Sequence, residues 1–198
     1  MSEHDYASSN RPGHYGVDGT GVTFAEAMIA TAWNVQGRVE SGRFVDEVRA
    51  RLDVTLPFAP NTIAKSDTVT ALWLGPESWL LVSHNGAQRA DFDACRAVVN
   101  AAGGALFDVS DARAAWTISG THAGAVLAKG CPLDFHARAF RAGTCAQSLL
   151  GHVNALFVKD SDAFTVMVAR SFARDVWHAL SRSAAQYGYE VLPPAPYR

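Results

Sequence analysis

The chain has 198 residues, a formal charge of −2, and 48% hydrophobic against 18% charged residues. This composition predicts a soluble, folded protein and excludes a disordered one. With so little net charge and no run of Lys or Arg, the chain lacks the electrostatic footprint of a nucleic-acid partner. No apolar stretch approaches the roughly 20 residues of a membrane-spanning helix, so we expect no membrane partner either.

The N-terminus and the cysteines bear on localisation. The first residues, MSEHDYASSNRPGHYG, are polar and lack the basic-then-apolar layout of a signal peptide. Cys95, Cys131 and Cys145 share no C-x-x-C spacing, and their odd number argues against a disulfide framework. We therefore expect a cytoplasmic protein with reduced thiols.

Both ends are expected to be arms. Residues 1–22 are rich in Gly, Ser, His and Asn without apolar periodicity, which indicates a flexible N-terminal arm. Residues 193–198 form a C-terminal tail, because the prolines of PPAPYR continue neither a helix nor a central strand. Between them, residues 23–192 are expected to form a single compact domain of two sub-halves, with the boundary near residue 110.

The first sub-half begins with a short amphipathic helix over GRFVDEVRARL, residues 42–52. The segment TVTALWLGPESWLLVS then predicts a hairpin with a four-residue Gly-Pro-Glu-Ser loop. A second helix follows over ADFDACRAVVNAA, ended by Gly-Gly, and ALFDVS is the next strand.

The second sub-half repeats this order of elements. ARAAWTISG is a strand, and THAGAVLAKG is a short helix with Thr121 as N-cap and Gly130 as its stop. QSLLGHVNALFVKD and AFTVMVAR are expected to be paired strands. The last helix carries one apolar stripe: Phe172, Val176, Leu180, Ala184 and Tyr187. The order predicts an α+β fold of two antiparallel sheets, each covered by helices.

The predicted hairpin is apolar on both faces. Val69, Ala71 and Trp73 alternate with Leu72 and Leu74. An antiparallel sheet with one wet face should instead alternate apolar and polar residues. These strands therefore require cover on both sides, either from the second half of the chain or from another subunit.

The segment AKGCPLDFHARAF suggests a thiol active site, with Cys131 as nucleophile, His136 as base and Asp134 orienting the base. Because Pro132 follows it, however, Cys131 is expected to be extended, away from a helix N-terminus that would activate it. We interpret Cys131 as a small apolar side chain that fills a turn.

Metal and nucleotide motifs are weak. The glycines of GVDGTG (Gly16, Gly19 and Gly21) lack the preceding strand that a dinucleotide site requires. The histidines are scattered without the spacing of a metal site, and we expect His178 and Asp175 to face solvent. The seven are His4, His14, His84, His122, His136, His152 and His178.

The segment FDVSDAR places four polar side chains, Asp108, Ser110, Asp111 and Arg113, after a strand. A ligand site and a turn capped by its own side chains are both open interpretations, and we favour the turn. No complete set of catalytic, cofactor-binding or metal-binding residues emerges from the sequence.

Several motifs resemble the gamma subunit of heterotetrameric sarcosine oxidase. They are WLGPESWLLV, FDVSDARAAWTISGTHAGAVLAKGCPLDFHARAF, CAQSLL and VARSFARDVW, and the resemblance runs from about Trp33 to Val191. FDVS…ISG…A…L also resembles the folate-binding aminomethyltransferase superfamily. The resemblance implies two ferredoxin-like halves in an aminomethyltransferase-like folate-binding domain.

The resemblance also implies an accessory function. The family's enzyme is an oxidoreductase that demethylates sarcosine to glycine, with formaldehyde or methylene-tetrahydrofolate and hydrogen peroxide as products. The expected partners are the alpha, beta and delta subunits; FAD, FMN, NAD and tetrahydrofolate are expected in the partner subunits, mainly the large alpha and beta subunits, and none in this chain. AKGCPLDFHARAF then belongs to the family's fold and docking, without catalytic residues of its own.

Two alternatives remain open. One is a stand-alone folate-binding one-carbon module, for which Asp108, Asp111 and Trp116 are the nearest candidates for a pterin site. The other is the equivalent subunit of an N-methyl amino-acid dehydrogenase complex, because substrate choice would reside in the flavin-bearing partner.

Overall fold

A computed structural model describes residues 11–84 and 91–197. The described chain forms two compact units, one built from residues 11–28, 114–142 and 147–195, and the other from residues 29–113, 143–146 and 196–197. Each unit combines a β-sheet with helices, which confirms the predicted α+β class. None of the helices in this described part has the length and apolar character needed to cross a membrane.

The unit around residues 29–113 contains a five-stranded sheet in the order β4-β5-β6-β3-β7. Neighbouring strands pair antiparallel, for example Trp33 with Leu81 and Val35 with Leu106. The strands are β3 (Thr31–Gln36), β4 (Ile63–Lys65), β5 (Val69–Gly75), β6 (Ser78–Ser83) and β7 (Ala105–Asp108).

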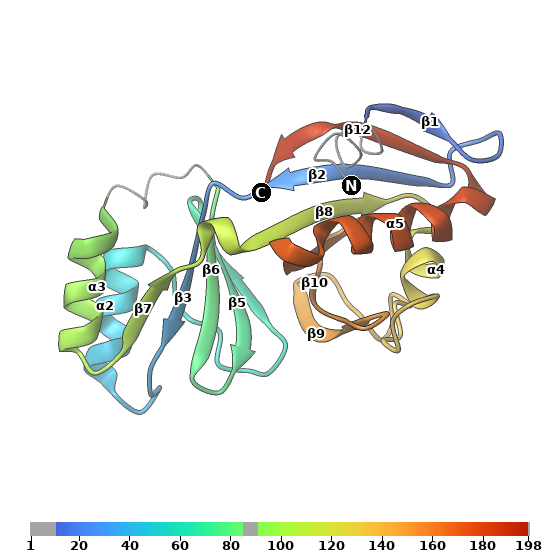
Figure 1. Cartoon of the computed structure of the whole chain (residues 1–198). Helices are drawn as coiled ribbons and strands as arrows, with labels where there is room; N and C mark the ends of the chain where they lie inside the picture. Colours follow the sequence, from blue (N-terminus) through green and yellow to red (C-terminus); the bar gives the residue numbers. More distant parts are fainter. Residues whose placement is uncertain (1–10, 85–90, 198) are drawn as a thin grey trace. The chain divides into compact units, whose positions relative to one another are not determined.

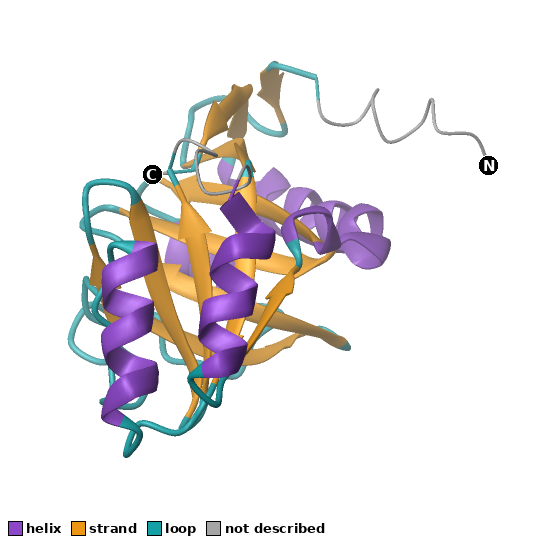
Figure 2. Cartoon of the chain, turned by 90° about the vertical axis from the view of Figure 1, so that its left-hand side faces the viewer, coloured by secondary structure: helices purple, strands orange, loops and turns teal. Residues whose placement is uncertain are grey.

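Helices α2 (Gly42–Leu52) and α3 (Phe92–Ala101) lie side by side on one face of this sheet (Figures 1 and 2). Phe44, Val48 and Leu52 recur every four residues along α2 and are buried, as a helix with one apolar stripe requires. The helices and the sheet face beneath them share one core, which includes Trp33, Val35, Val69, Ala71, Trp79, Leu81, Cys95 and Val99. Both helices were predicted at these positions.

The β5–β6 hairpin was predicted with a four-residue loop, but its turn is shorter. Gly75 pairs with Ser78, so only Pro76 and Glu77 connect the strands, and a register shift occurs between Trp73 and Gly75. Leu72 is fully buried although it points away from the helices, as the apolar pattern on both faces predicted.

The other unit contains a seven-stranded sheet in the order β1-β12-β2-β8-β11-β10-β9. Glu26 pairs with Trp116, and Phe157 pairs with Val166, in antiparallel ladders. The strands are β1 (Gly13–Tyr15), β2 (Val22–Met28), β8 (Arg113–Ser119), β9 (Thr144–Leu150), β10 (Val153–Lys159), β11 (Ala163–Ala169) and β12 (Tyr189–Pro196).

Helices α4 (Ala123–Ala128) and α5 (Ala173–Ala184) pack on this second sheet, with α5 running along β8 in Figure 1. The Trp177 ring of α5 stacks on Trp116 at 6.4 Å and meets Phe24 edge-on at 5.3 Å. These three side chains are fully buried. Phe172 does not continue the predicted apolar stripe, since it precedes α5 and is 41% exposed.

The termini differ from the predicted arms. Residues 13–15 form β1 and pair with β12, so the arm prediction is wrong for this segment, while residues 1–10 lie outside the described chain. The predicted tail also contains part of β12, which includes Pro193 and Pro194. The pairing of β12 with β1 ends at Val191, so Pro193 and Pro194 lie beyond it. Their lack of an N–H group therefore costs no hydrogen bond to β1.

Strands β2, β3 and β4 were not predicted, and the single strand expected over residues 147–160 is divided. Gly151 and His152 turn the chain between β9 and β10, with Gly151 at a left-handed φ of 63°. The chain passes between the units after residues 28, 113, 142, 146 and 195, so residues 11–28 join the unit that holds most of the later residues. The boundary near residue 110 stays a prediction. The predicted single domain over residues 23–192 stays a prediction.

Candidate functional site

The segment after α4, where a thiol site was considered, is a turn held by its own polar groups. His136 N–H donates to Asp134 Oδ1 at 2.9 Å, and Arg138 N–H donates to His136 Nδ1 at 3.2 Å. Phe140 N–H also donates to the His136 carbonyl at 2.9 Å. The aspartate and the imidazole therefore bind the backbone of the turn, in the manner of side-chain-capped turns.

Aromatic side chains anchor the same turn to the sheet. Phe135 lies 5.3 Å from Phe157, 5.5 Å from Phe164 and 5.9 Å from Phe140, each measured between ring centroids. Cys131 is buried at 6% exposure, whereas His136 is exposed. Because Cys131 is buried while His136 is exposed, the burial supports the interpretation of Cys131 as an apolar side chain that fills the turn.

The polar cluster of FDVSDAR is also a capped turn. Ser110 Oγ donates to Asp108 Oδ1 at 2.5 Å, and Ser110 N–H donates to the same oxygen at 3.0 Å. Ala32 N–H in turn donates to Ser110 Oγ at 3.0 Å, which joins the turn to β3. The turn interpretation accounts for Asp108 and Ser110, while Asp111 is exposed and Arg113 is half-buried.

Of the residues considered for a pterin site, Trp116 is not accessible. It is fully buried, with Trp177 stacked against it, so it cannot line an open cleft. Asp108 accepts two hydrogen bonds from Ser110 through one oxygen, Oδ1. Asp108 and Asp111 are both exposed.

His14, His84 and His122 occupy separate environments. His84 Nδ1 lies 3.2 Å from the Asp67 carbonyl and its Nε2 lies 2.8 Å from Thr70 Oγ1. Because a carbonyl only accepts, Nδ1 carries the proton and Nε2 accepts from the threonine hydroxyl. His14 Nε2 contacts the Val17 carbonyl at 3.1 Å, and the His122 ring stacks on Tyr187 at 4.3 Å. His4 lies outside the described residues.

The cysteines are free thiols in apolar surroundings. Burial raises the pKa of Cys145 to about 11. Its thiol lies within donating distance of the Trp73 and Thr62 carbonyls, 3.5 Å from each. Burial likewise raises the pKa of Cys95, with a smaller contribution from Asp91. Raised pKa values keep both thiols protonated and unreactive near neutral pH. Within the described residues, no group of three or more His, Cys, Asp or Glu side chains is placed to hold a metal ion.

Gly19 of GVDGTG has a left-handed φ of 99°, and an added Cβ would meet nothing within 4 Å, whereas Gly16 and Gly21 serve close packing. Contrary to expectation, the short strand β1 precedes them, but they meet the 3₁₀ turn η4 (Ala185–Tyr187). A Cβ on Gly16 would lie 2.5 Å from the Ala185 carbonyl oxygen, and one on Gly21 would lie 2.7 Å from that of Tyr187. Any side chain at these two positions would collide with a carbonyl oxygen, so both positions require Gly.

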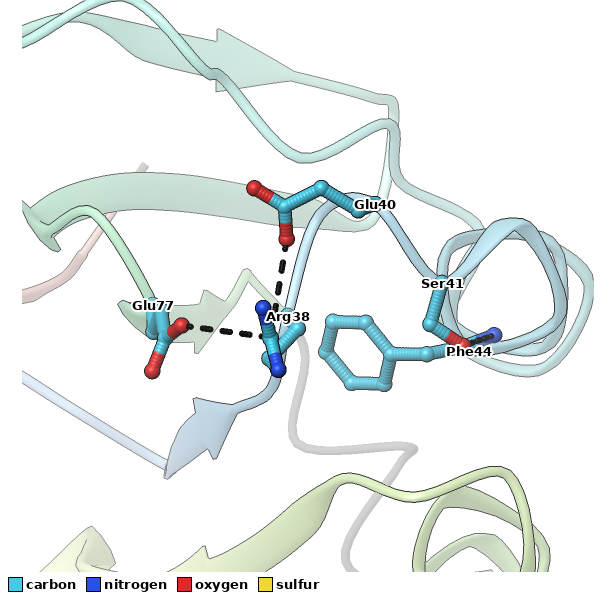
Figure 3. A network of polar contacts seen from close by, with 5 residues as sticks. All are labelled: Arg38, Glu40, Ser41, Phe44 and Glu77. Atoms are coloured by element: carbon cyan, nitrogen blue, oxygen red, sulfur yellow. Dashed lines mark hydrogen bonds and ion pairs between the residues drawn. The ribbon is translucent and has the colours of Figure 1, made fainter.

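A charged cluster at the start of α2 is a surface feature. Arg38 Nε lies 3.8 Å from a carboxylate oxygen of Glu40 and 3.8 Å from one of Glu77, with Ser41 and Phe44 beside it (Figure 3). All three charged side chains are more than 60% exposed, so their pairing contributes little to stability.

A groove of about 670 Å³ lies among α4, the β9–β10 turn and α5. Sequence reasoning did not identify it. The available signal was the spacing of Asp175, His178 and Arg182, which puts them on one face of α5. Asp175 and His178 are exposed as predicted, and they line this groove together with His152 and Lys129.

The fold is shared with two solved structures. This chain is similar to a chain of heterotetrameric sarcosine oxidase from Corynebacterium sp. U-96 in complex with pyrrole 2-carboxylate, with a TM-score of 0.80, 23% identity and 93% coverage of both chains. It is also similar to the glycine cleavage system aminomethyltransferase T of Bartonella henselae, with a TM-score of 0.58 and 14% identity over 89% of this chain and 48% of that one. The chain therefore belongs to the class of proteins that share this fold.

Sequence comparison identifies the family within that class. The model of the sarcosine oxidase, gamma subunit family matches residues 36–186. Sarcosine oxidase subunit gamma of Corynebacterium sp. (strain P-1) is 29% identical over 176 residues, covering 86% of this chain and 84% of that protein. The Arthrobacter sp. subunit gamma is 30% identical over 124 residues, covering 62% and 60%. The chain belongs to the sarcosine oxidase gamma subunit family.

Proposed function

We propose that this chain is the small, non-catalytic gamma subunit of a heterotetrameric sarcosine oxidase. The complex would oxidatively demethylate sarcosine to glycine, with formaldehyde or methylene-tetrahydrofolate and hydrogen peroxide as products. The chain would assemble with alpha, beta and delta subunits in the cytoplasm and stabilise the subunits that carry flavin. FAD, FMN, NAD and tetrahydrofolate would be held by those partners.

One observation carries the accessory role beyond family membership. The residues that most resemble an active centre, Asp134 and His136, bind the backbone of their own turn, and Cys131 is buried beside them. A general base must instead reach the proton that it abstracts, and a nucleophilic thiol must be accessible to its substrate. The arrangement supports a role in the shape of this surface.

Substitution in the assembled enzyme tests this role. Complexes that carry Cys131→Ser or His136→Ala should retain turnover of sarcosine within a few-fold of wild type. Turnover should be measured as hydrogen peroxide released per mole of intact complex. A loss of about 10²- to 10⁴-fold, typical of the removal of an acid–base catalyst, would overturn the proposal.

The likeness to aminomethyltransferase T favours a second candidate, a folate-binding module that acts alone. Calorimetric titration of the isolated chain with tetrahydrofolate separates the two. The accessory-subunit proposal expects no heat of binding, because Trp116, the aromatic candidate, is buried against Trp177. A saturable heat that Asp108→Asn or Asp111→Asn abolishes would support the second candidate.

A further inference from the structure

The groove among α4, the β9–β10 turn and α5 has three walls that hydrogen bonds hold together. Lys129 Nζ, just after α4, donates to the Ser183 carbonyl of α5 at 2.5 Å and lies 4.9 Å from the Tyr187 ring centroid. Gly151 N–H, in the β9–β10 turn, donates to the Gly130 carbonyl at 2.7 Å. A groove whose walls are already connected loses little conformational freedom when it is filled.

The floor of the groove is apolar. Val126, Leu150 and Leu180 line it, and each is buried within the protein. Ala179, in contrast, is exposed and lies on the α5 wall. The volume of about 670 Å³ is in the range of ligand-sized sites, large enough to receive side chains from another molecule.

The rim of the groove is more basic than the protein as a whole. The rim carries two cationic side chains, Lys129 and Arg182, and one carboxylate, Asp175. The whole chain, in contrast, has a formal charge of −2. Lys129 is engaged with the last turn of α5, so its charge offsets the carbonyls at that helix end. Arg182 is exposed, and its fork of N–H groups suits a carboxylate.

From the apolar floor and this basic rim, we propose that the groove binds an acidic segment of a partner subunit in the assembled oxidase. This inference rests on the proposed function as a subunit. An apolar side chain of the segment enters over Leu150 and Leu180, and a neighbouring Asp or Glu pairs with Arg182. The hollow beside β7 is a weaker candidate, because its Arg96 already pairs with Asp93 at 3.0 Å and lies over the Phe92 ring.

Competitive assembly tests the proposal. Wild-type and variant chains are co-expressed in equal amounts with the partner subunits, and the ratio of the two in the purified complex is read by native mass spectrometry. Arg182→Glu reverses the rim charge, and Ala179→Trp fills the groove without changing charge. Each should be under-represented about tenfold or more.

Matched controls repeat these substitutions elsewhere. Arg43→Glu and Ala50→Trp change exposed residues of α2, outside the groove, and should be incorporated within about twofold of wild type. Thermal melting of each isolated chain shows whether the variant is folded. A groove variant that melts well below wild type is replaced by the milder Arg182→Gln or Ala179→Leu, which should be depleted in the same direction.

The outcomes distinguish the two proposals. Failure of the wild-type chain to enter any complex overturns the proposed function and this inference together. A wild-type complex that incorporates folded Arg182→Glu and Ala179→Trp chains equally well overturns the inference alone. Self-association of the isolated chain that Ala179→Trp abolishes would assign the groove to a second copy, which also overturns it.

Discussion

At the scale of single residues, Phe44 determines what its neighbours can be. Its fully buried ring lies against Gly37 and Gly104, where an added Cβ would approach ring carbons to 2.6 Å and 2.5 Å. At Gly104 the Cβ would also lie 2.9 Å from the Gln36 carbonyl oxygen, which belongs to the sheet backbone. A close-packed core has no space to absorb such an atom.

Gly104→Ala should therefore destabilise the protein by about 1–3 kcal/mol, the usual range for overpacking a core. Gly42→Ala is the matched control, because a Cβ on Gly42 at the start of α2 meets nothing within 4 Å. It should leave stability unchanged or raise it by less than about 1 kcal/mol. Urea unfolding of the two variants measures both effects, and equal stabilities would contradict the packing account.

The buried thiol of Cys145 makes the stability of the fold depend on pH. The pKa of this thiol rises from its ordinary 9.0 to about 11, because burial disfavours the thiolate. The folded state thus prefers the protonated form, and the resulting stabilisation is complete below pH 9 and lost as the pH rises through 11. Its magnitude is about 2–3 kcal/mol.

The free energy of unfolding should fall between pH 9 and pH 11, and Cys145→Ala should make this fall shallower. A residual slope is expected, since burial also raises the pKa values of Cys95 and Tyr189. Chemical denaturation at a series of pH values measures the slope. Identical slopes for the wild type and the variant would exclude Cys145 as a contributor.

At the scale of elements, two hydroxyl residues near the start of a helix, Ser41 and Thr121, differ in whether they cap that helix. Ser41 precedes α2, and its Oγ accepts from Phe44 N–H at 3.4 Å, a long N-cap bond (Figure 3). Thr121 was expected to cap α4, but the N-cap position is His122 and makes no side-chain capping bond. The α4 backbone turns after Gly120, which has a left-handed φ of 102°.

Ser41→Ala should lower stability by about 0.5–1 kcal/mol, the lower part of the N-cap range, because the bond is long. Thr121→Ala should change it by less than about 0.5 kcal/mol. Thermal melting with circular dichroism at 222 nm provides the comparison. A larger effect at Thr121 than at Ser41 would reverse this assignment of the caps.

The elements that the sequence predicts well are those with strong local periodicity. Phe44, Val48 and Leu52 identify α2, and the alternation around Trp116 and Ile118 identifies β8. Strand β1 has only three residues and depends on pairing with β12, which lies more than 170 residues later. No pattern within a short stretch of sequence indicates a pairing over this distance, so the pairing of β1 with β12 could not be predicted.

The same distinction applies to the candidate site. The turn chemistry of Asp108, Asp134 and His136 is local, and the sequence indicated turns at these positions. The groove instead combines Lys129, Leu150 and Arg182 from three separate elements. Only the folded chain brings those residues to one place, because the contact between Lys129 and Ser183 spans 54 positions.

At the scale of the whole molecule, both units are packed around buried aromatic side chains. Both sheets have buried tryptophans and close aromatic contacts, while the reactive-looking side chains are committed to turns. Membership in the sarcosine oxidase gamma subunit family agrees with a chain that acts through association. Its contribution is then measured as assembly of the complex.

The most direct test is native mass spectrometry of the chain purified alone and of the chain co-expressed with alpha, beta and delta subunits. We expect a colourless, inactive chain alone and a heteromer that contains one copy of it per set of partners. Omission of the chain should reduce the yield or thermal stability of the active complex. A fully active, equally stable oxidase that assembles without this chain would contradict the account.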